Sequence, residues 1–288
     1  MSEEMKQYPR FRIGARIEHF VLMVSFTILG VTGIPQMFAL DSGVARSLIS
    51  LMGGIETVRV IHRWAAFFLV LGSVYHLFTS AYRFFVKRER MRMIPEKKDL
   101  FDAINLALYN LGLRDEHPRM AKFNFSEKFE YWAVVWGTVI MTITGFMLWN
   151  PIATTSVLPG EIIPVALTAH GGEALLAVLS IVVWHFYNVH IKHFNPSMFT
   201  GKLPHDQMEE EHALELERLE AGGDPWTELD RPVLERRRRI FLVASVIIGA
   251  LVLAVLIWAF TFEETAITTV LPTATSDVFA PLQETPMP

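Results

Sequence analysis

The fold is decided by residues 164–190, which read PVALTAHGGEALLAVLSIVVWHFYNVH. This stretch is long and apolar enough to cross a bilayer, for which a helix needs about 20 residues. It contains three histidines, His170, His185 and, at its end, His190. Ionisable side chains are costly inside a membrane, and those that occur there are candidates for function. The stretch therefore predicts a membrane-spanning helix with a functional group near each end.

Four more stretches have the same character, at residues 17–40, 59–82, 130–150 and 240–262. The last of them carries no charged residue at all. The first is longer than the apolar region of a cleaved signal peptide, and no small-residue cleavage site follows it. We therefore expect an all-α integral membrane protein, a four-helix bundle with a fifth, C-terminal transmembrane helix.

The composition supports a membrane protein and narrows its chemistry. Of the 288 residues, 51% are hydrophobic and 19% are charged, against about 25% charged residues in an average globular chain. A net charge of −4 argues against a nucleic-acid partner. The chain has no cysteine, which excludes disulfides, thiolate-ligated iron–sulfur clusters, cysteine-type zinc sites and covalently attached c-type haem. Redox chemistry here would have to use histidine-ligated metal or a bound organic cofactor.

The basic residues predict the direction of each span. Of the 26 Lys and Arg residues, 23 lie before span one, between spans two and three, or between spans four and five. Residues 150–163 and 263–288 carry none. Because Lys and Arg accumulate in cytoplasmic loops, we expect a cytoplasmic N-terminus and an extracytoplasmic C-terminus.

The segments outside the spans differ in character. We expect a short helix near Lys98–Gly112, an acidic amphipathic helix over residues 205–222, and an extended tail. The chain then divides into the four-helix domain (1–203), an acidic helix with a basic linker (204–239), the fifth span (240–262) and an extracytoplasmic tail (263–288).

The spacing of the intramembrane histidines suggests two iron sites. His62 and His76, 14 residues apart on span two, project within about 40° of one helix face and lie about 21 Å apart. His170 and His185, 15 apart on span four, lie about 60° off a common face. Both spans run from outside to inside, so one histidine of each lies near each surface. Two levels of paired imidazoles suit two stacked bis-histidine haems.

A lone membrane histidine more often makes a hydrogen bond between helices, but four histidines at two matched depths favour haem. Arg16, Arg59 and Arg63 are candidates to pair with haem propionates, and interfacial anchoring is the alternative for Arg16. Several glycines could admit the macrocycle or simply allow close helix packing, namely Gly30, Gly33, Gly72, Gly137, Gly145, Gly171 and Gly172.

Several motifs carry a family resemblance. They are RIEHF at 16–20, RVIHRW at 59–64, PEKKDL at 95–100, KFNFSEKFEYW at 122–132, TGFMLWNP at 144–151, HGGEALL at 170–176 and WHFYNVH at 184–190. Over residues 10–203 the chain resembles the cytochrome b (gamma) subunits of membrane-bound formate dehydrogenases, with the related hydrogenase and thiosulfate reductase cytochromes b. That resemblance implies a dihaem cytochrome in a prokaryotic cytoplasmic membrane.

The resemblance also implies roles for particular residues. His62 and His170 match the ligands of the extracytoplasmic-side haem, and His19 and His185 match those of the cytoplasmic-side haem. Asn124 matches a residue of the quinone site beside the inner haem, for a quinone such as menaquinone or ubiquinone. An N-cap role before span three is the alternative for Asn124.

Two departures leave the inner pair open. In the best-known member of the family the two histidines of span four are 14 residues apart, and one more residue rotates His185 by about 100° in a regular helix. His76 is an additional histidine at the same depth. His185 could therefore pair with His19 or, as in the cytochrome b of bc-type complexes, with His76. A third arrangement has three haems, with a further pair formed by His19 and His190.

We therefore expect a membrane-anchoring b-type cytochrome that transfers electrons between an extracytoplasmic redox partner and the quinone pool. The partners would be an iron–sulfur or multihaem cytochrome c subunit and a catalytic subunit, so no catalytic site for a soluble substrate is expected here. Glu127, Glu130 and Lys128 are candidates for proton transfer. The competing interpretations are a quinol-oxidising subunit of a bc-like complex, a standalone b561-like carrier and a haem-free transporter.

Overall fold

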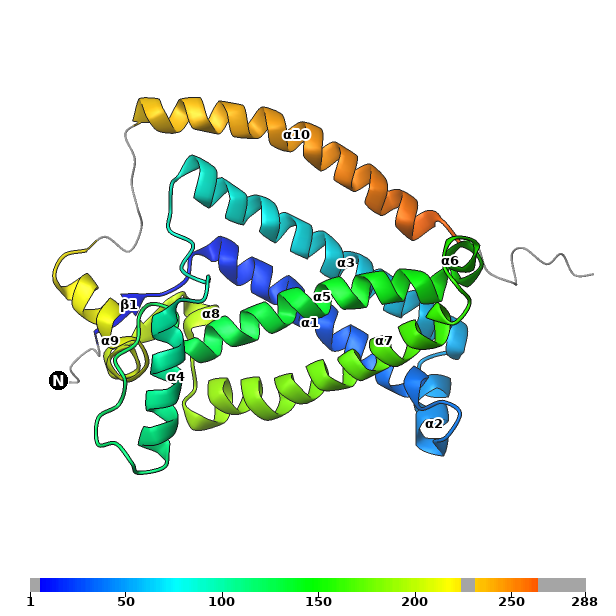
Figure 1. The fold of residues 1–288 in the computed structure, drawn as a ribbon, viewed down its shortest axis with the longest axis horizontal. Coiled ribbons are helices and arrows are strands. Elements are labelled where there is room, and N and C mark those ends of the chain that lie inside the picture. Colours follow the sequence, from blue (N-terminus) through cyan, green and yellow to red (C-terminus); the bar gives the residue numbers. More distant parts are fainter. Residues whose placement is uncertain (1–5, 224–230, 264–288) are drawn as a thin grey trace, which may run out of the picture.

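Five long helices dominate the computed structural model, which describes residues 6–223 and 231–263 (Figure 1). The helices that are long and apolar enough to span a membrane are α1 (Ile13–Met37), α3 (Ile55–Ala81) with the π-helix η1 (Tyr82–Val86), α5 (Phe125–Trp149), α7 (Ile162–Leu179) with the π-helices η2 (Ser180–His185) and η3 (Tyr187–Lys192), and α10 (Arg231–Thr261). The predicted all-α membrane fold with five spans is confirmed. The expected extended tail falls on residues 264–288, which lie outside the described part of the chain.

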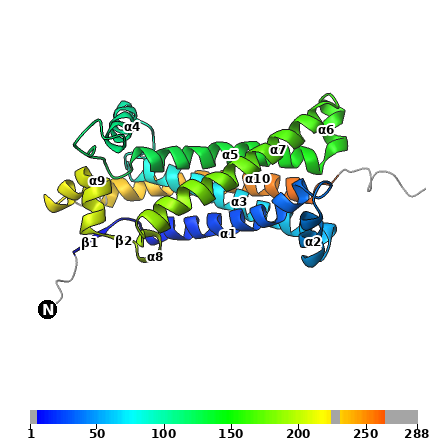
Figure 2. The ribbon, with the colours of Figure 1, turned by 90° about the horizontal axis from the view of Figure 1, so that it is seen from below.

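The first four spans form two helical hairpins that pack together. α1 pairs with α3, α5 pairs with α7, and α1 also contacts α7. The short helices α2 (Gly43–Leu51) and α6 (Pro151–Val157) lie at one end of the bundle, called here the α2–α6 end (Figures 1 and 2). α4 (Lys97–Asn110), α8 (Ser197–Thr200) and α9 (His205–Glu220) lie at the opposite α4–α9 end. The predicted loop helices at Lys98–Gly112 and 205–222 are confirmed as α4 and α9.

Glycines allow the spans to approach closely. A methyl group on Gly30 would lie 3.3 Å from Val178, and one on Gly72 would lie 3.3 Å from Val21. Both distances are tighter than ordinary side-chain contact, so larger residues would push these helices apart. Of the two roles that the sequence left open for these two glycines, the structure shows helix packing.

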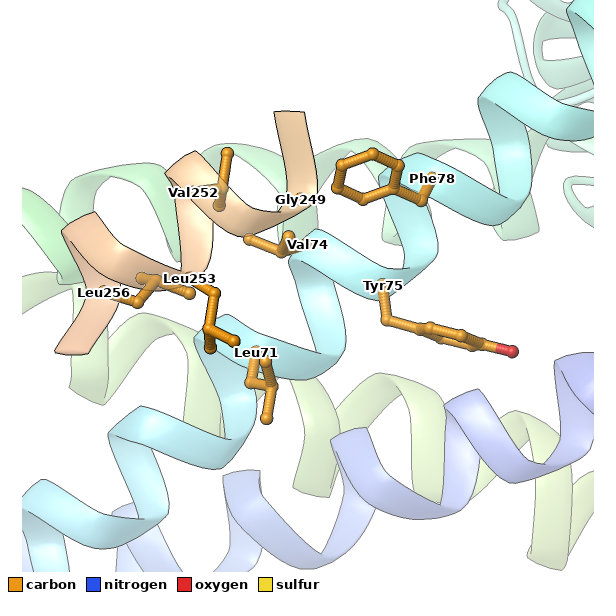
Figure 3. Close-up of a pocket in the computed structure, with 8 residues that line it drawn as sticks. All are labelled: Leu71, Val74, Tyr75, Phe78, Gly249, Val252, Leu253 and Leu256. Carbon is orange, nitrogen blue, oxygen red and sulfur yellow. The ribbon is translucent and has the colours of Figure 1, made fainter. Parts of the chain in front are cut away.

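The fifth span, α10, lies along the outside of α3 (Figure 1). Ring contacts attach its C-terminal part, where Phe260 lies 5.1 Å from Phe67 and 5.8 Å from Trp149 between ring centres. About midway along α10 the two helices leave an apolar pocket of about 210 Å³ between Leu71 and Phe78 of α3 and Gly249 of α10 (Figure 3).

A small cap covers the α4–α9 end. The strands β1 (Gln7–Pro9) and β2 (Lys202–Pro204) pair antiparallel, with Tyr8 opposite Leu203. Tyr8 and Leu203 form an apolar core with Met208 and Leu216 of α9. Within α9, His212 departs from helical geometry and is completely buried, and its Nδ1 donates a hydrogen bond to the carbonyl of Ala121 at 3.0 Å.

Because His212 is buried, we expect acid to destabilise the cap. Burial, with the nearby Arg10, lowers the pKa of His212 from 6.5 to about 4, while Glu127 and Glu215 oppose that shift. The unfolded chain therefore binds a proton at higher pH than the folded chain does. The contribution of His212 to the free energy of unfolding should be fully present above pH 6.5. It should fall as the pH drops toward 4, by up to about 3 kcal/mol. His212→Asn keeps an N–H donor but does not titrate, so its thermal unfolding should change less with pH. An identical pH dependence of both proteins would contradict this assignment.

Candidate functional site

Two histidine pairs lie inside the bundle, one toward each end. His62 of α3 faces His170 of α7 toward the α2–α6 end, with 6.4 Å between ring centres and 62° between ring planes. His19 of α1 faces His185 of η2 toward the α4–α9 end, with 6.3 Å between centres and 34° between planes. His170 and His185 are 15 residues apart, so the two pairs are separated by about 20 Å along the helix.

Threonines on the neighbouring helices hold both members of the His62–His170 pair. Nδ1 of His62 lies 2.8 Å from Oγ1 of Thr32, and Nδ1 of His170 lies 2.9 Å from Oγ1 of Thr144. Each hydroxyl donates its one hydrogen to the carbonyl four residues earlier, at 2.7 Å. The hydroxyl oxygen must then accept the hydrogen from Nδ1, so the lone pair of each imidazole is on Nε2. A metal-binding histidine is usually oriented in this way.

A glycine follows each of these threonines and makes room for the ring. A methyl group on Gly33 would lie 3.1 Å from Cε1 of His62, and one on Gly145 would lie 3.3 Å from Cε1 of His170. In each of the two hairpins, a Thr–Gly dipeptide (Thr32–Gly33 or Thr144–Gly145) thus orients one histidine and leaves room for its ring. Sequence reasoning had singled out the two glycines but missed the two threonines, and the repeated Thr–Gly pair was the signal that could have found them.

The His19–His185 pair is oriented by a carboxylate. Nδ1 of His185 lies 2.7 Å from Oε2 of Glu130 on α5. A carboxylate accepts the hydrogen on Nδ1, which leaves Nε2 of His185 with its lone pair. Glu130 therefore fixes His185 from outside the pair.

A π-helix brings His185 into register with His170. The sequence expectation of a rotation of about 100° assumed a regular α-helix. In the structure, residues Ser180–His185 form the π-helix η2, in which hydrogen bonds run from residue i to i+5 and one extra residue is accommodated in the turn. The 15-residue spacing therefore acts as a 14-residue spacing would, and His185 reaches His19.

The dimensions of both pairs fit one iron ion between two imidazoles. A metal–nitrogen bond of about 2.0 Å, and about 1.1 Å more to the ring centre, put two rings on opposite sides of one ion roughly 6.2 Å apart. The observed 6.3 Å and 6.4 Å match this geometry. Within the described residues there is no group of three or more His, Asp or Glu side chains suited to a metal ion. Histidine is one of the axial ligands by which proteins hold haem iron, so a pair of facing imidazoles suits a haem.

His76 lies apart from both pairs. Its Nδ1 lies 2.7 Å from Oε2 of Glu18, and its Nε2 lies 3.0 Å from the hydroxyl of Tyr131. Both ring nitrogens are therefore engaged in hydrogen bonds. His190 contacts the rings of Phe186 and Phe194. Of the arrangements that the sequence left open, the structure brings together His19 and His185.

The other predicted binding residues make contacts of their own. Arg16 donates to the carbonyl of Met198 at 3.0 Å. The guanidinium of Arg63 lies 3.8 Å from the ring centre of Trp149 and 3.6 Å from a carboxylate oxygen of Glu263. Arg59 pairs with Glu56 on an exposed helix turn at 3.0 Å. In the structure these arginines bind protein groups at the two ends of the bundle.

Asn124 is the N-cap of α5. Its Oδ1 accepts a hydrogen bond from the backbone N–H of Glu127 at 2.9 Å, and Glu127 accepts one from the backbone N–H of Asn124 at 3.0 Å. Glu127 also pairs with the buried Arg10 at 2.7 Å, and Lys128 pairs with Asp99 at 2.8 Å. Of the three candidates for proton transfer, only Glu130 contacts one of the paired histidines.

We expect Thr144→Val to weaken cofactor binding at the His62–His170 pair, because valine has the shape of threonine but cannot accept from Nδ1 of His170. Loss of such an orienting group typically costs about tenfold to a hundredfold in metal affinity. Haem content after titration with haemin would measure this. Thr142→Val is the matched control, since Thr142 is exposed and makes the same bond to its own helix, at 2.7 Å to the carbonyl of Thr138. Equal haem binding by both variants would contradict the role of Thr144.

Comparison with known proteins agrees with this geometry. The family model described as prokaryotic cytochrome b561 matches residues 10–201, which include all four spans that carry the two pairs. The cytochrome b556(Fdn) subunit of the nitrate-inducible formate dehydrogenase of Escherichia coli (strain K12) is 20% identical over 221 residues, covering 75% of this chain and 94% of that protein. The cytochrome b556(fdo) subunit of formate dehydrogenase from the same strain is 23% identical over 181 residues, covering 62% and 76%.

The match extends over two thirds of the chain and takes in both histidine pairs, the threonines that orient the first pair and the glutamate that orients the second. A cytochrome of this kind contains b-type haem, which the paired imidazoles fit. On this evidence the chain is a multi-pass membrane cytochrome and belongs to the prokaryotic cytochrome b561 family.

Proposed function

We propose that this chain is the membrane-anchoring cytochrome b subunit of a quinone-linked oxidoreductase. It transfers electrons between an extracytoplasmic redox partner and the quinone pool. The observation that carries the proposal is the pair of matched bis-histidine sites at two levels of one bundle. When bound, two b-type haems supply one-electron carriers at these two levels. The related cytochrome subunits of formate dehydrogenases support this kind of role.

Each part of the site has a defined task in this proposal. His62 with His170, and His19 with His185, present Nε2 atoms as axial ligands. Thr32, Thr144 and Glu130 take the hydrogens of Nδ1 and keep the rings oriented, as the distances of 2.7–2.9 Å allow. A carboxylate partner strengthens the electron donation of its imidazole to a metal, and Glu130 is the only carboxylate among these three orienting groups.

The α4–α9 end faces the cytoplasm in this proposal, since it carries most of the Lys and Arg residues. The quinone, menaquinone or ubiquinone, would bind at this end beside the His19–His185 pair. Asn124 supports that location. Within the described residues its amide NH2 makes no hydrogen bond, which leaves a donor for a quinone carbonyl. Reduction of the quinone would then consume two electrons and take two protons from the cytoplasmic side.

The partners would be an extracytoplasmic iron–sulfur or multihaem cytochrome c subunit and a catalytic subunit. α10 lies outside the residues that the family model matches. We propose that it replaces a transmembrane helix that a partner subunit supplies in the formate dehydrogenases. Removal of residues 233–288 should then release the partner subunits during purification. Recovery of an intact complex without those residues would rule this role out.

The transfer itself can be tested in liposomes that contain the haem-loaded chain and menaquinone. A membrane-impermeant reductant is supplied on the α2–α6 side, and quinol formation and proton uptake on the other side are followed. Quinol should form, with protons taken from the α4–α9 side. A haem-loaded chain that does not reduce quinone would refute the proposal.

His76→Gln should retain both cofactor sites, because both nitrogens of His76 are bound to Glu18 and Tyr131 rather than facing another histidine. His19→Gln should lose the site at the α4–α9 end. The pyridine haemochrome content of the two variants measures this difference. A loss of haem in His76→Gln with full content in His19→Gln would assign the ligand to His76 instead.

A further inference from the structure

The helix α4 carries its apolar residues on the outside. Leu100 and Phe101 are 60% and 62% exposed, and Leu111, just past its end, is 72% exposed. Together with Ile104 and Leu108 these side chains form a stripe about 100° wide along the helix. We call these five residues the α4 stripe.

The acidic residues of α4 face the protein instead. Asp99 and Asp102 are each only 8% exposed. Asp99 pairs with Lys128 of α5 at 2.8 Å, and Asp102 pairs with Lys98 at 2.7 Å. A helix on the surface of a soluble domain has the opposite arrangement, with its apolar stripe against the core. The surroundings of the α4 stripe must therefore be apolar.

The position of α4 relative to α5 places it at the edge of a bilayer. α5 has 25 residues, or about 37 Å of helix, against a hydrocarbon thickness of about 30 Å. The excess of about 7 Å is a little more than one turn, and the charged first turn, with Glu127 and Lys128, is the part that suits the headgroup layer. Asp99 contacts Lys128 in the first turn, and the carbonyl of Met93 accepts from Nε1 of Trp132 in the second, at 2.9 Å. α4 thus lies beside the first turns of α5 rather than beyond its end.

The direction of α4 agrees with this level. It runs crosswise to the spans in Figure 1, and Figure 2 shows it nearly end-on and outside the bundle. A helix crosswise to membrane spans lies in the plane of the membrane. Two exposed cations lie at its ends, Lys97 in its first turn and Arg114 just past its last, and within the described residues neither pairs with a carboxylate. Cations beside an apolar stripe suit a surface of lipid phosphates.

We propose that α4 is an interfacial membrane helix, with its apolar stripe in the acyl boundary of the leaflet at the α4–α9 end and its flanking cations on anionic phospholipid headgroups. This inference goes beyond the electron-transfer proposal and needs only that the five spans cross a bilayer. It gives the loop between α3 and α5 a function in fixing the depth of the bundle in the membrane.

The lack of cysteine allows a direct test with single labels. Leu111→Cys and Ile104→Cys would each carry a nitroxide in the full haem-loaded chain, in nanodiscs of phosphatidylcholine and phosphatidylglycerol. Asn110→Cys is the matched control, because Asn110 is also exposed and projects about 100° away from Leu111. Relaxation by molecular oxygen, which concentrates in lipid, is compared with relaxation by a water-soluble nickel chelate.

The ratio of nitroxide relaxation by oxygen to relaxation by the nickel chelate should be several-fold higher at positions 104 and 111 than at 110. Replacing phosphatidylglycerol by phosphatidylcholine should lower the ratio at 104 and 111 and leave it unchanged at 110. Equal ratios at all three positions would overturn the proposal, since the stripe would then face water. Protection of 104 and 111 from both reagents would overturn it too, because protein would then cover the stripe. Haem content and quinone reduction do not enter this test, so its failure is separate from failure of the proposed function.

Discussion

His170→Ala is expected to remove one of two haems and to stop electron transfer across the membrane. His170 supplies one of the two imidazoles at the α2–α6 end. Thr144 orients its ring through a hydrogen bond, and Gly145 leaves room for the ring. Alanine leaves His62 without an opposite ligand. The pyridine haemochrome content should fall from two haems per chain to one, and quinone reduction in liposomes should fall to background.

His190→Ala is the matched control for that substitution. His190 is on the same span but contacts only the rings of Phe186 and Phe194 among the ring contacts of the described residues. It should keep both haems and full quinone reduction. Gel filtration and circular dichroism of both variants separate loss of haem from loss of fold. Two haems in His170→Ala, or one in His190→Ala, would contradict the assignment of the ligands.

Insertion of one alanine between Val182 and Val183 is expected to remove the other site. The π-helix η2 already accommodates one extra residue between His170 and His185. A further residue would turn His185 by about 100° away from His19 and Glu130. The haem at the His19–His185 pair should be lost, while the Thr144-supported pair should keep its haem.

Deletion of Val183 should have the opposite outcome. Val183 is 67% exposed on the outside of the bundle, and its loss allows η2 to become a regular α-helix with a 14-residue spacing. His185 should stay opposite His19, and both haems should remain. If the deletion abolishes the site and the insertion does not, η2 does not set the register of His185 against His19.

The spans and the level of each histidine could be predicted from the sequence, because hydropathy and helical rise determine both. The partner of His185 could not. Its orientation depends on η2, and the wider turn has no sequence signature beyond the one-residue departure from the family spacing. The engagement of His76 by Glu18 and Tyr131 depends on contacts among three helices, which spacing along one helix does not contain.

The threonines and the cap were also beyond a single-sequence argument. Thr32 and Thr144 are ordinary residues in apolar helices, and only the packing of adjacent helices gives them histidine partners. The cap joins strands from the two ends of the four-helix domain, and three-residue strands such as β1 and β2 are too short to show a period. The sequence predicted α4 as a helix, but it did not show that its apolar stripe faces outward. That orientation depends on the ion pair between Asp99 and Lys128, which holds the opposite face of α4 against the protein.

The central claim is that two bis-histidine sites at two depths carry electrons through this chain. Its most direct test is the number of haems per polypeptide in the purified full-length chain, measured as pyridine haemochrome against quantitative amino-acid analysis and supported by reduced-minus-oxidised spectra. We expect two b-type haems with bis-histidine spectra. A chain with no haem, or with a single haem that survives His170→Ala and His19→Gln together, would contradict it.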